Sequence, residues 1–114
     1  MTRPKIGQFC KVKAEVKKYN RYCGERHDPT IKRQYPRETR YEALTPLGFS
    51  GYYIGCRTIH EGVTNLEWDG DDYVSWSYPV FKRRKSREVW LFVRNERSTP
   101  RMAYPEHVEI EAAE

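Results

Sequence analysis

The stretch at residues 50–60, S-G-Y-Y-I-G-C-R-T-I-H, constrains the fold most, because it is dense in β-branched and aromatic residues and is interrupted by two glycines. Successive side chains of a strand point to opposite faces. One face here would carry Tyr52, Ile54, Cys56 and Thr58, and the other would carry Tyr53, Arg57 and Ile59. Neither face is wholly polar. This is typical of a strand that crosses a small barrel and bends at a glycine, so that its covered face changes along its length.

Alternation predicts a second strand early in the chain, at residues 6–18. Its apolar side chains are Cys10, Val12, Ala14 and Val16, and between them lie Lys11, Lys13, Glu15 and Lys17. A helix would scatter these apolar residues around its circumference, whereas a half-buried strand places them on one face. We therefore expect a strand with a basic outer face.

Turn residues and apolar runs predict the remaining elements. After residue 60, Glu61-Gly62 offers a tight turn and residues 63–68 offer a returning strand. We expect a long basic loop at 19–36, a weak strand at 37–44, a turn at 45–48, an acidic turn at 69–72, a strand at 73–81 that is an edge or is broken at Pro79, the most buried strand at 88–94, one helical turn at 105–107 and a closing strand at 108–110.

The length of 114 residues favours one domain, covering 1–114, because a second core would need a longer chain. Hydrophobic residues make up only 38%, but 14% of residues are aromatic, and each ring buries roughly 150–250 Å², so a packed core is still expected. The three cysteines, without a secretory signal or a run that spans a membrane, favour free thiols in a cytoplasm.

The element order resembles that of SH3-like barrels, including their Tudor and KOW-type relatives. The resemblance rests on the tail at 104–110, which looks like the helical turn that leads into the last SH3 strand, and on the expected hairpin at 51–68. It implies a mainly β, small, partly open barrel of five to seven antiparallel strands, with an OB-type barrel as the alternative. The short, basic, aromatic chain also resembles small accessory proteins of tailed bacteriophages.

The net charge of +5 is unevenly distributed. Residues 1–40 carry +8 and residues 81–101 carry +6, whereas residues 41–80 carry −5. Segregated positive charge suggests an anionic partner, although oppositely charged segments could also pair across the sheet. Arg and Lys beside exposed rings suit phosphates and bases. The candidate ligand-binding residues are Lys82, Arg83, Arg84, Lys85, Arg87, Arg57, Tyr53, Lys11, Lys13, Arg26, Arg33 and Tyr35.

Metal and catalytic sites are not expected. Cys23–His27 and Cys56–His60 would invite a zinc hypothesis, but positions four apart on a strand lie about 13 Å apart, too far to share one ion. The carboxylates Asp69, Asp71 and Asp72 suit a turn better than a cation site. No nucleophile elbow, phosphate-binding loop or dinucleotide fingerprint occurs, and no cofactor is expected.

Two functions follow from these features. The first is a non-enzymatic, phage-encoded binding protein that holds nucleic acid or a nucleotide through Arg, Lys and exposed rings. The alternative is a counter-defence inhibitor or adaptor that blocks a host protein, such as a nucleic-acid-processing defence enzyme. The oligomeric state is open in both cases, and both place the protein in the cytoplasm of a bacterial host.

Overall fold

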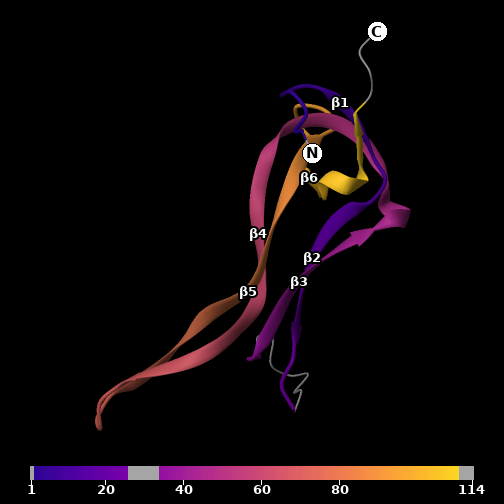
Figure 1. Cartoon of the computed structure of the whole chain (residues 1–114). Coiled ribbons are helices and arrows are strands. Elements are labelled where there is room, and N and C mark those ends of the chain that lie inside the picture. The colour runs from indigo at the N-terminus through magenta and orange to yellow at the C-terminus, as the bar shows by residue number, and fades with distance from the viewer. Residues whose placement is uncertain (1, 26–33, 111–114) are drawn as a thin grey trace. The chain divides into compact units, whose positions relative to one another are not determined.

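Seven strands and two short 3-10 turns make up the computed structural model, which describes residues 2–25 and 34–110 (Figure 1). The elements are β1 (Phe9–Val12), β2 (Glu15–Tyr22), β3 (Arg37–Leu44), η1 (Thr45–Leu47), β4 (Phe49–Gly70), β5 (Ser75–Val93), β6 (Arg101–Ala103), η2 (Pro105–His107) and β7 (Val108–Ile110). The predictions of a mainly β chain, of a strand at 37–44 and of a helical turn before the last strand are confirmed. Among the described residues no helix is long and apolar enough to cross a membrane.

The strands form a closed, five-stranded antiparallel barrel with two additional strands. The order is β3-β2-β6-β5-β4-β1-β7, and a further pairing between β3 and β4 closes a barrel of the five strands β2, β3, β4, β5 and β6. The sequence predicted a partly open barrel. Arg37 of β3 pairs with Thr64 of β4, and Trp90 of β5 pairs with Ala103 of β6. β1 and β7 continue the sheet beyond β4, with Cys10 opposite Ile110.

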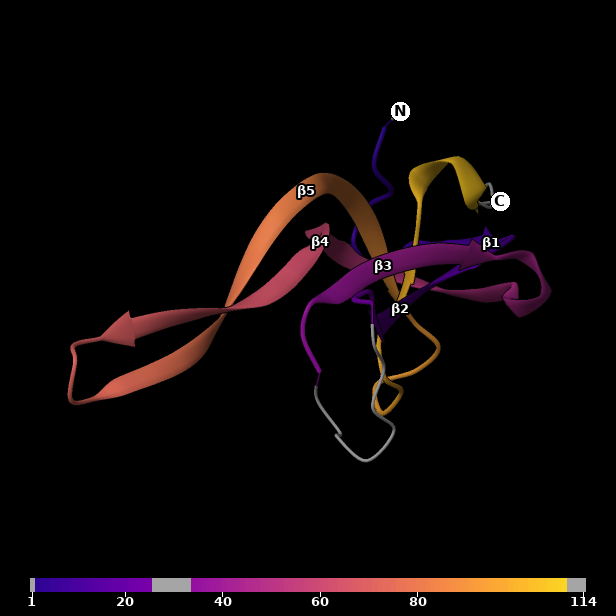
Figure 2. The ribbon, with the colours of Figure 1, turned by 90° about the horizontal axis from the view of Figure 1, so that it is seen from below.

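The chain divides into two compact units, each described here by itself. The first unit comprises Met1–Lys18, Tyr41–Ile59 and Arg87–Glu114. The second unit comprises Tyr19–Arg40 and His60–Ser86. The long strands β4 and β5 each contribute residues to both units, and Figure 2 shows the two strands running side by side to the turn that joins them.

The first unit contains the hydrophobic core. One cluster joins Cys10, Val12, Tyr53, Trp90, Phe92 and Ala103, and a second joins Val16, Ile59, Val89 and Tyr104. The predicted burial of Cys10, Val12, Ala14 and Val16 and the predicted buried run in β5 are both confirmed. The three cysteines are free, as predicted.

Glycine bends β4 in the first unit. Gly55 has a φ of +146°, in a region that only glycine adopts readily. Tyr53 is buried before the bend, Cys56 packs against the core just after it, and Ile59 is buried three residues later. Tyr53 and Ile59 are six residues apart and share a face, whereas Cys56 belongs to the other face, so side chains from both faces of the strand contact the core near the bend.

The early strand at 6–18 is divided, contrary to the prediction of one continuous strand. β1 ends at Val12 and β2 begins at Glu15. Ala14, Glu15 and Val16 are all buried, so Glu15 does not lie on a basic outer face. The Glu15 carboxylate instead forms ion pairs with Lys17 Nζ at 3.3 Å and Arg101 Nε at 3.9 Å, and these ion pairs compensate for its burial.

The predicted turn at Glu61-Gly62 is wrong, and with it the hairpin at 51–68, because β4 runs unbroken from Phe49 to Gly70. Gly62 instead has a packing role in the second unit. A Cβ on this residue would lie 2.2 Å from the carbonyl oxygen of Lys82, so glycine permits a close approach of β4 to β5. The chain reverses at the acidic turn instead, where Asp71 Oδ1 accepts hydrogen bonds from the backbone N–H groups of Tyr73 and Val74.

Pro79 does not interrupt β5, which extends from Ser75 to Val93. Proline lacks an N–H donor and is tolerated where a strand has an open edge. One neighbour of β5 is β4, and the other, β6, pairs only with Trp90, Leu91 and Phe92. Pro79 therefore lies on a part of β5 that has an open edge in the described chain. Of the two predictions for Pro79, an edge strand or a broken strand, the structure agrees with the edge strand.

Candidate anion-binding surface

Four consecutive cations, Lys82, Arg83, Arg84 and Lys85, form the basic segment of the second unit. The sequence predicted separate strands at 73–81 and 88–94, which leaves these residues between them, but they lie in the interior of the continuous strand β5. All four are exposed. Within residues 2–25 and 34–110, β6 pairs with β5 only at Trp90, Leu91 and Phe92, so the segment lies at an edge that no described strand covers.

None of the four cations has a carboxylate within ion-pair distance among the described residues. Cations spaced about 3.4 Å apart along a strand repel one another unless water, salt or a bound anion compensates. The basic segment is therefore a local concentration of positive charge that has no direct ion pair in the described part of the chain.

An open hollow of about 460 Å³ lies beside the basic segment within the second unit. Lys82 and Arg84 line it from β5, and Val63, Asn65, Leu66 and Glu67 line it from β4. Alternate residues of a strand share a face, so Lys82 and Arg84 point to the same side of β5. The hollow combines the apolar side chains of Val63 and Leu66 with two cations and one carboxylate, Glu67, so a flat ring bearing a phosphate would meet both apolar surface and net positive charge.

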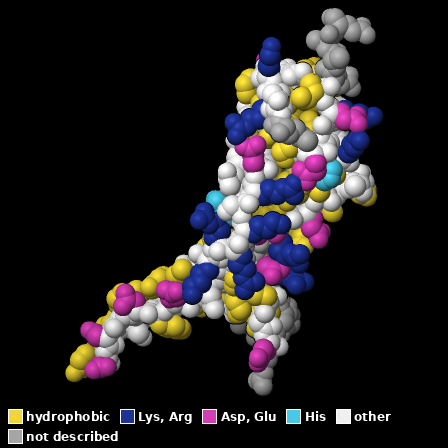
Figure 3. All heavy atoms as spheres, in the orientation of Figure 1, with side chains coloured by type: hydrophobic (Ala, Val, Ile, Leu, Met, Phe, Trp, Pro, Cys, Tyr) yellow, Lys and Arg dark blue, Asp and Glu magenta, His cyan; other side chains and the backbone are white. Residues whose placement is uncertain are grey.

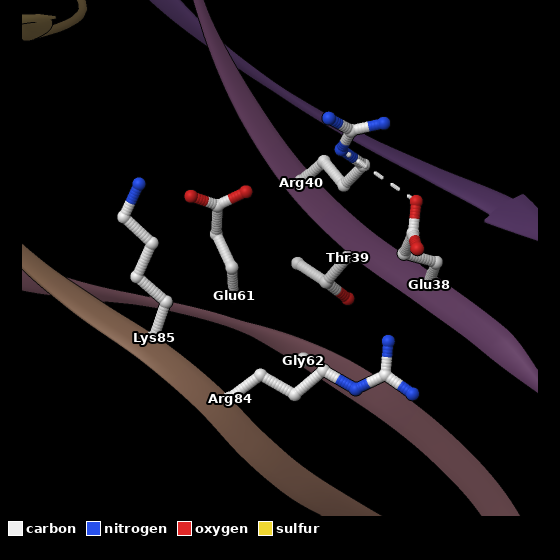
Figure 4. Close-up of a pocket in the computed structure, with 7 residues that line it drawn as sticks. All are labelled: Glu38, Thr39, Arg40, Glu61, Gly62, Arg84 and Lys85. Atoms are coloured by element: carbon white, nitrogen blue, oxygen red, sulfur yellow. Dashed lines mark ion pairs between the residues drawn. The ribbon is translucent and has the colours of Figure 1, made fainter.

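A smaller pocket of about 150 Å³ lies between β3, β4 and β5 in the same unit (Figure 4). Glu38, Thr39, Arg40, Glu61, Gly62, Arg84 and Lys85 line it. Its charges have both signs, and Arg40 Nε and Arg21 Nε each lie 3.6 Å from Oε1 of Glu38. Typical small-molecule pockets occupy roughly 300–1,000 Å³, so this pocket is too small for a nucleotide.

Arg87 is held within the first unit and differs from the basic segment. Its guanidinium forms an ion pair with Glu106, and its Cζ lies 3.6 Å from the centre of the Tyr104 ring. Burial is the largest single influence on the pKa of Glu106 and acts to raise it, but the hydrogen bond from Arg87, a backbone hydrogen bond and the charges of Arg87 and His107 together lower the pKa. Arg87 therefore has structural partners already, and the sequence grouped it with its neighbours only because it is adjacent to them.

Tyr53 is not an exposed binding ring, so this part of the prediction is wrong. Only 3% of its surface is exposed, and its ring centre lies 6.0 Å from that of Trp90 and 5.9 Å from that of Phe92. Burial is the main cause of the raised pKa of its phenol. Alternation placed Tyr53 on one face with Arg57 and Ile59, but on this face Tyr53 and Ile59 are buried and only Arg57 is exposed.

The remaining candidates are dispersed between the units or lie outside the described residues. Lys11, Lys13 and Arg57 are exposed in the first unit, where Lys13 Nζ lies 2.8 Å from Oε1 of Glu109. Tyr35 is half-buried in the second unit, and Arg26 and Arg33 lie outside the described residues. The candidate set as a whole stays a prediction.

The described part of the second unit also exposes rings that the candidate set did not contain. Trp68 is 70% exposed, Tyr73 94%, Trp76 51% and Tyr78 38%. The general prediction that some rings stay exposed is confirmed. Figure 3 shows hydrophobic side chains along the two-stranded hairpin of β4 and β5, together with acidic side chains toward its turn. If the strand is taken to continue through Pro79, alternation places Trp76 and Tyr78 on the same face as Lys82. This pattern could have identified the two rings from the sequence.

Other chemistry has less support in this unit. Among residues 2–25 and 34–110, no three His, Cys, Asp or Glu side chains are grouped to hold a metal. His60 Nδ1 lies 2.7 Å from Ser86 Oγ, but no carboxylate in the described chain orients the ring. Asp71 has a lowered pKa, first because of its hydrogen bond from the Val74 N–H, which fits the predicted turn.

Comparison with protein-family models, curated proteins and solved structures finds no match to this chain. The fold class is therefore that of a small all-β barrel protein, defined by its own strand pairings. The candidate site is defined by the basic segment and the hollow that borders it.

Proposed function

We propose that this protein is a non-enzymatic binding protein for nucleic acid, which it contacts through the basic segment. One observation carries the proposal: four adjacent cations are exposed without a carboxylate partner in the described chain, whereas five cations of the first unit are each paired. Phosphates would relieve the mutual repulsion of the four cations and release condensed counterions.

A polymeric anion suits this surface better than a single nucleotide does. Neighbouring side chains of β5 alternate between its faces, so the four cations do not converge on one phosphate. Instead they extend over about 10 Å of exposed strand. A chain of phosphates that follows the open edge of β5 can approach cations on both faces.

The salt dependence of binding to a short single-stranded oligonucleotide tests the proposal. The variant K82A/R83A/R84A/K85A removes four charges from the basic segment. The control variant K5A/K18A/R94A/R97A removes the same charge from exposed residues of the first unit. Each lost phosphate contact should lower the slope of log affinity against log salt by about 0.7.

We expect the first variant to lose affinity and up to about 3 units of slope, for four contacts, and the control to change much less. Equal losses in the two variants would show that only net charge matters. The absence of binding to any oligonucleotide at low salt would remove nucleic acid as the ligand.

A second candidate function is a protein-blocking inhibitor, which the exposed rings near the acidic turn favour. Trp and Tyr dominate the energetics of protein interfaces, and Trp68 and Tyr73 are the most exposed rings of the described chain. In this proposal the SH3-like barrel would be that of a phage counter-defence protein in the bacterial cytoplasm. A stoichiometric protein partner that survives nuclease treatment and high salt in a pull-down from bacterial lysate would support it.

A further inference from the structure

One face of β5 carries two rings and two cations in a line. Trp76 and Tyr78 have even numbers, as do Lys82 and Arg84, and β5 is continuous across all of them. Because side chains two residues apart point the same way, these four share a face over about 27 Å of strand. The fact that Lys82 and Arg84 line the same hollow agrees with this arrangement.

The rings of Trp76 and Tyr78 are partly exposed, because the part of the hairpin that carries them has no buried side chains and, in the described chain, no third strand beside it. From residue 65 to residue 81 none of the side chains of the hairpin is buried. β3 pairs with β4 only at Gly62, Val63 and Thr64, so no third strand accompanies the hairpin beyond that point in the described chain. Large exposed apolar surfaces on soluble proteins usually mark a binding site.

The charges along the hairpin indicate what covers the rings. Two cations, Lys82 and Arg84, lie at one end of the row, where Glu67 is the one carboxylate lining the same hollow, and the carboxylates of Asp71 and Asp72 lie at the other end. A ligand on this face must therefore be flat where it meets the rings, negatively charged where it meets the cations, and must end before the acidic turn. A lipid surface meets these conditions poorly, because the acidic turn would repel anionic headgroups.

We propose that this face of β5 binds single-stranded nucleic acid, with bases stacked on Trp76 and Tyr78 and the adjoining phosphates held by Lys82 and Arg84. This inference rests on the proposed function and specifies its ligand class. Base faces in a duplex are already stacked on one another, whereas unpaired bases are free to stack on aromatic side chains. The hollow between Leu66 and Arg84 offers room for a further base beside the cations.

The first test compares affinities for a single-stranded oligonucleotide and for a duplex of the same length at one salt concentration. The variant W76A should lose about fivefold or more in affinity for the single strand, the lower end of the effect of removing a stacked ring. Its affinity for the duplex should not change. Y73A is the matched control, because Tyr73 is more exposed but lies outside β5 and should leave both affinities unchanged.

The second test separates the two faces of β5 at constant charge. K82A/R84A removes two cations from the face that carries the rings, and R83A/K85A removes two from the opposite face. We expect the first pair to weaken single-strand binding more. Because W76A could also disturb the hairpin, a second readout keeps Trp76 intact. The W68F variant removes the other exposed tryptophan, and in this variant the single strand should quench the fluorescence of Trp76, whereas the duplex should not.

The possible failures are distinguishable. If neither nucleic acid binds at low salt, the proposed function is wrong, and this inference falls with it. If both bind equally, W76A is silent and fluorescence is unchanged, the basic segment still binds nucleic acid but the stacking face is wrong. If sedimentation shows a stable dimer without nucleic acid that W76A dissociates, the rings are covered by a second copy of the chain, and the inference is overturned.

Discussion

The basic segment of the second unit differs from five paired cations of the first. In the first unit Arg3, Lys13, Lys17, Arg87 and Arg101 each lie against a carboxylate, and Arg87 also stacks on Tyr104. In the second unit the basic segment has no such partner in the described chain. Paired cations are part of the structure and are not available to a ligand, so sequence clusters of charge need to be sorted by partner before they are assigned a function.

The aromatic residues show the same contrast. Tyr53, Trp90 and Phe92 pack edge to face in the first unit and are almost fully buried. Trp76 and Tyr78 in the second unit remain partly exposed. A buried ring stabilises the fold through the area it removes from water, whereas an exposed ring contributes little until a ligand covers it. The predictions below test whether stability and binding divide between the units in this way.

The largest expected effect comes from truncating the core of the first unit. Phe92→Ala should lower the free energy of unfolding by about 3–5 kcal/mol, because it leaves a cavity between Phe49 and Tyr53. Trp76→Ala should change it by less than about 0.5 kcal/mol, as is usual for surface substitutions. Urea denaturation measures both values, and comparable losses would contradict the contrast between the units.

Amide hydrogen exchange gives the next largest difference. Backbone amides at residues 65–78 belong to a hairpin without a buried side chain, whereas those of Val89, Trp90 and Phe92 lie in the core. Segments with few buried contacts open locally at a lower free-energy cost. We expect exchange in the hairpin to be at least about tenfold faster, a difference of 1.4 kcal/mol or more in opening free energy. Uniform protection would show that the hairpin is as stable as the core.

A pair of arginines in β5 provides a smaller and sharper comparison. Arg87→Ala removes an ion pair and a stacking contact, each worth about 0.5–1 kcal/mol at a partly exposed site, so unfolding should become easier by about 1 kcal/mol. Arg84→Ala should leave stability nearly unchanged and weaken oligonucleotide binding. Thermal unfolding and oligonucleotide-binding assays on both variants check this difference. A loss of stability in Arg84→Ala with a loss of binding only in Arg87→Ala would contradict it.

The smallest expected effect is a pH dependence in the first unit. The hydrogen bond from Arg3, and next that from the Trp90 indole, lower the pKa of Glu88. A carboxyl group whose pKa is lowered by folding stabilises the protein above its unfolded pKa, about 4.3 for Glu, and this stabilisation is lost as pH falls through the folded value. Wild type should exceed Glu88→Gln in stability at neutral pH.

That margin should shrink below about pH 4, which urea denaturation at several pH values would show. Lys82→Ala serves as a comparison, because Lys82 has no carboxylate partner in the described chain. Its stability relative to wild type should not vary over the same range. A margin for Glu88→Gln that is constant with pH would mean that the interaction with Arg3 contributes nothing.

Local signals predicted much of the fold. Alternation found the buried residues Cys10, Val12 and Val16, and the apolar run found Trp90 and Phe92. Turn residues found η1, the acidic turn and η2. These features are short-range: each depends on neighbours in the sequence and on side-chain period, which sequence patterns describe directly.

Features that depend on distant strands were not predictable in this way. Gly62 looks like a turn residue, but it lies where β4 approaches Lys82 of β5. The pairing of Arg87 with Glu106 depends on an element 19 residues farther along the chain. Tyr53 is buried because it packs against Trp90 and Phe92 of β5. The basic segment itself was visible in the sequence, whereas its lack of carboxylate partners and the exposed rings in line with it needed the strand geometry.

Ultraviolet cross-linking of an oligothymidylate to the whole protein, followed by mass spectrometry of the peptides, tests the central claim most directly. Nucleic acid should contact the second unit through β5 and leave the core strands of the first unit untouched. The account predicts adducts on Trp76 or Tyr78, suppressed in K82A/R84A and retained in R83A/K85A. Adducts confined to residues 2–18, or equal suppression in both variants, would contradict it.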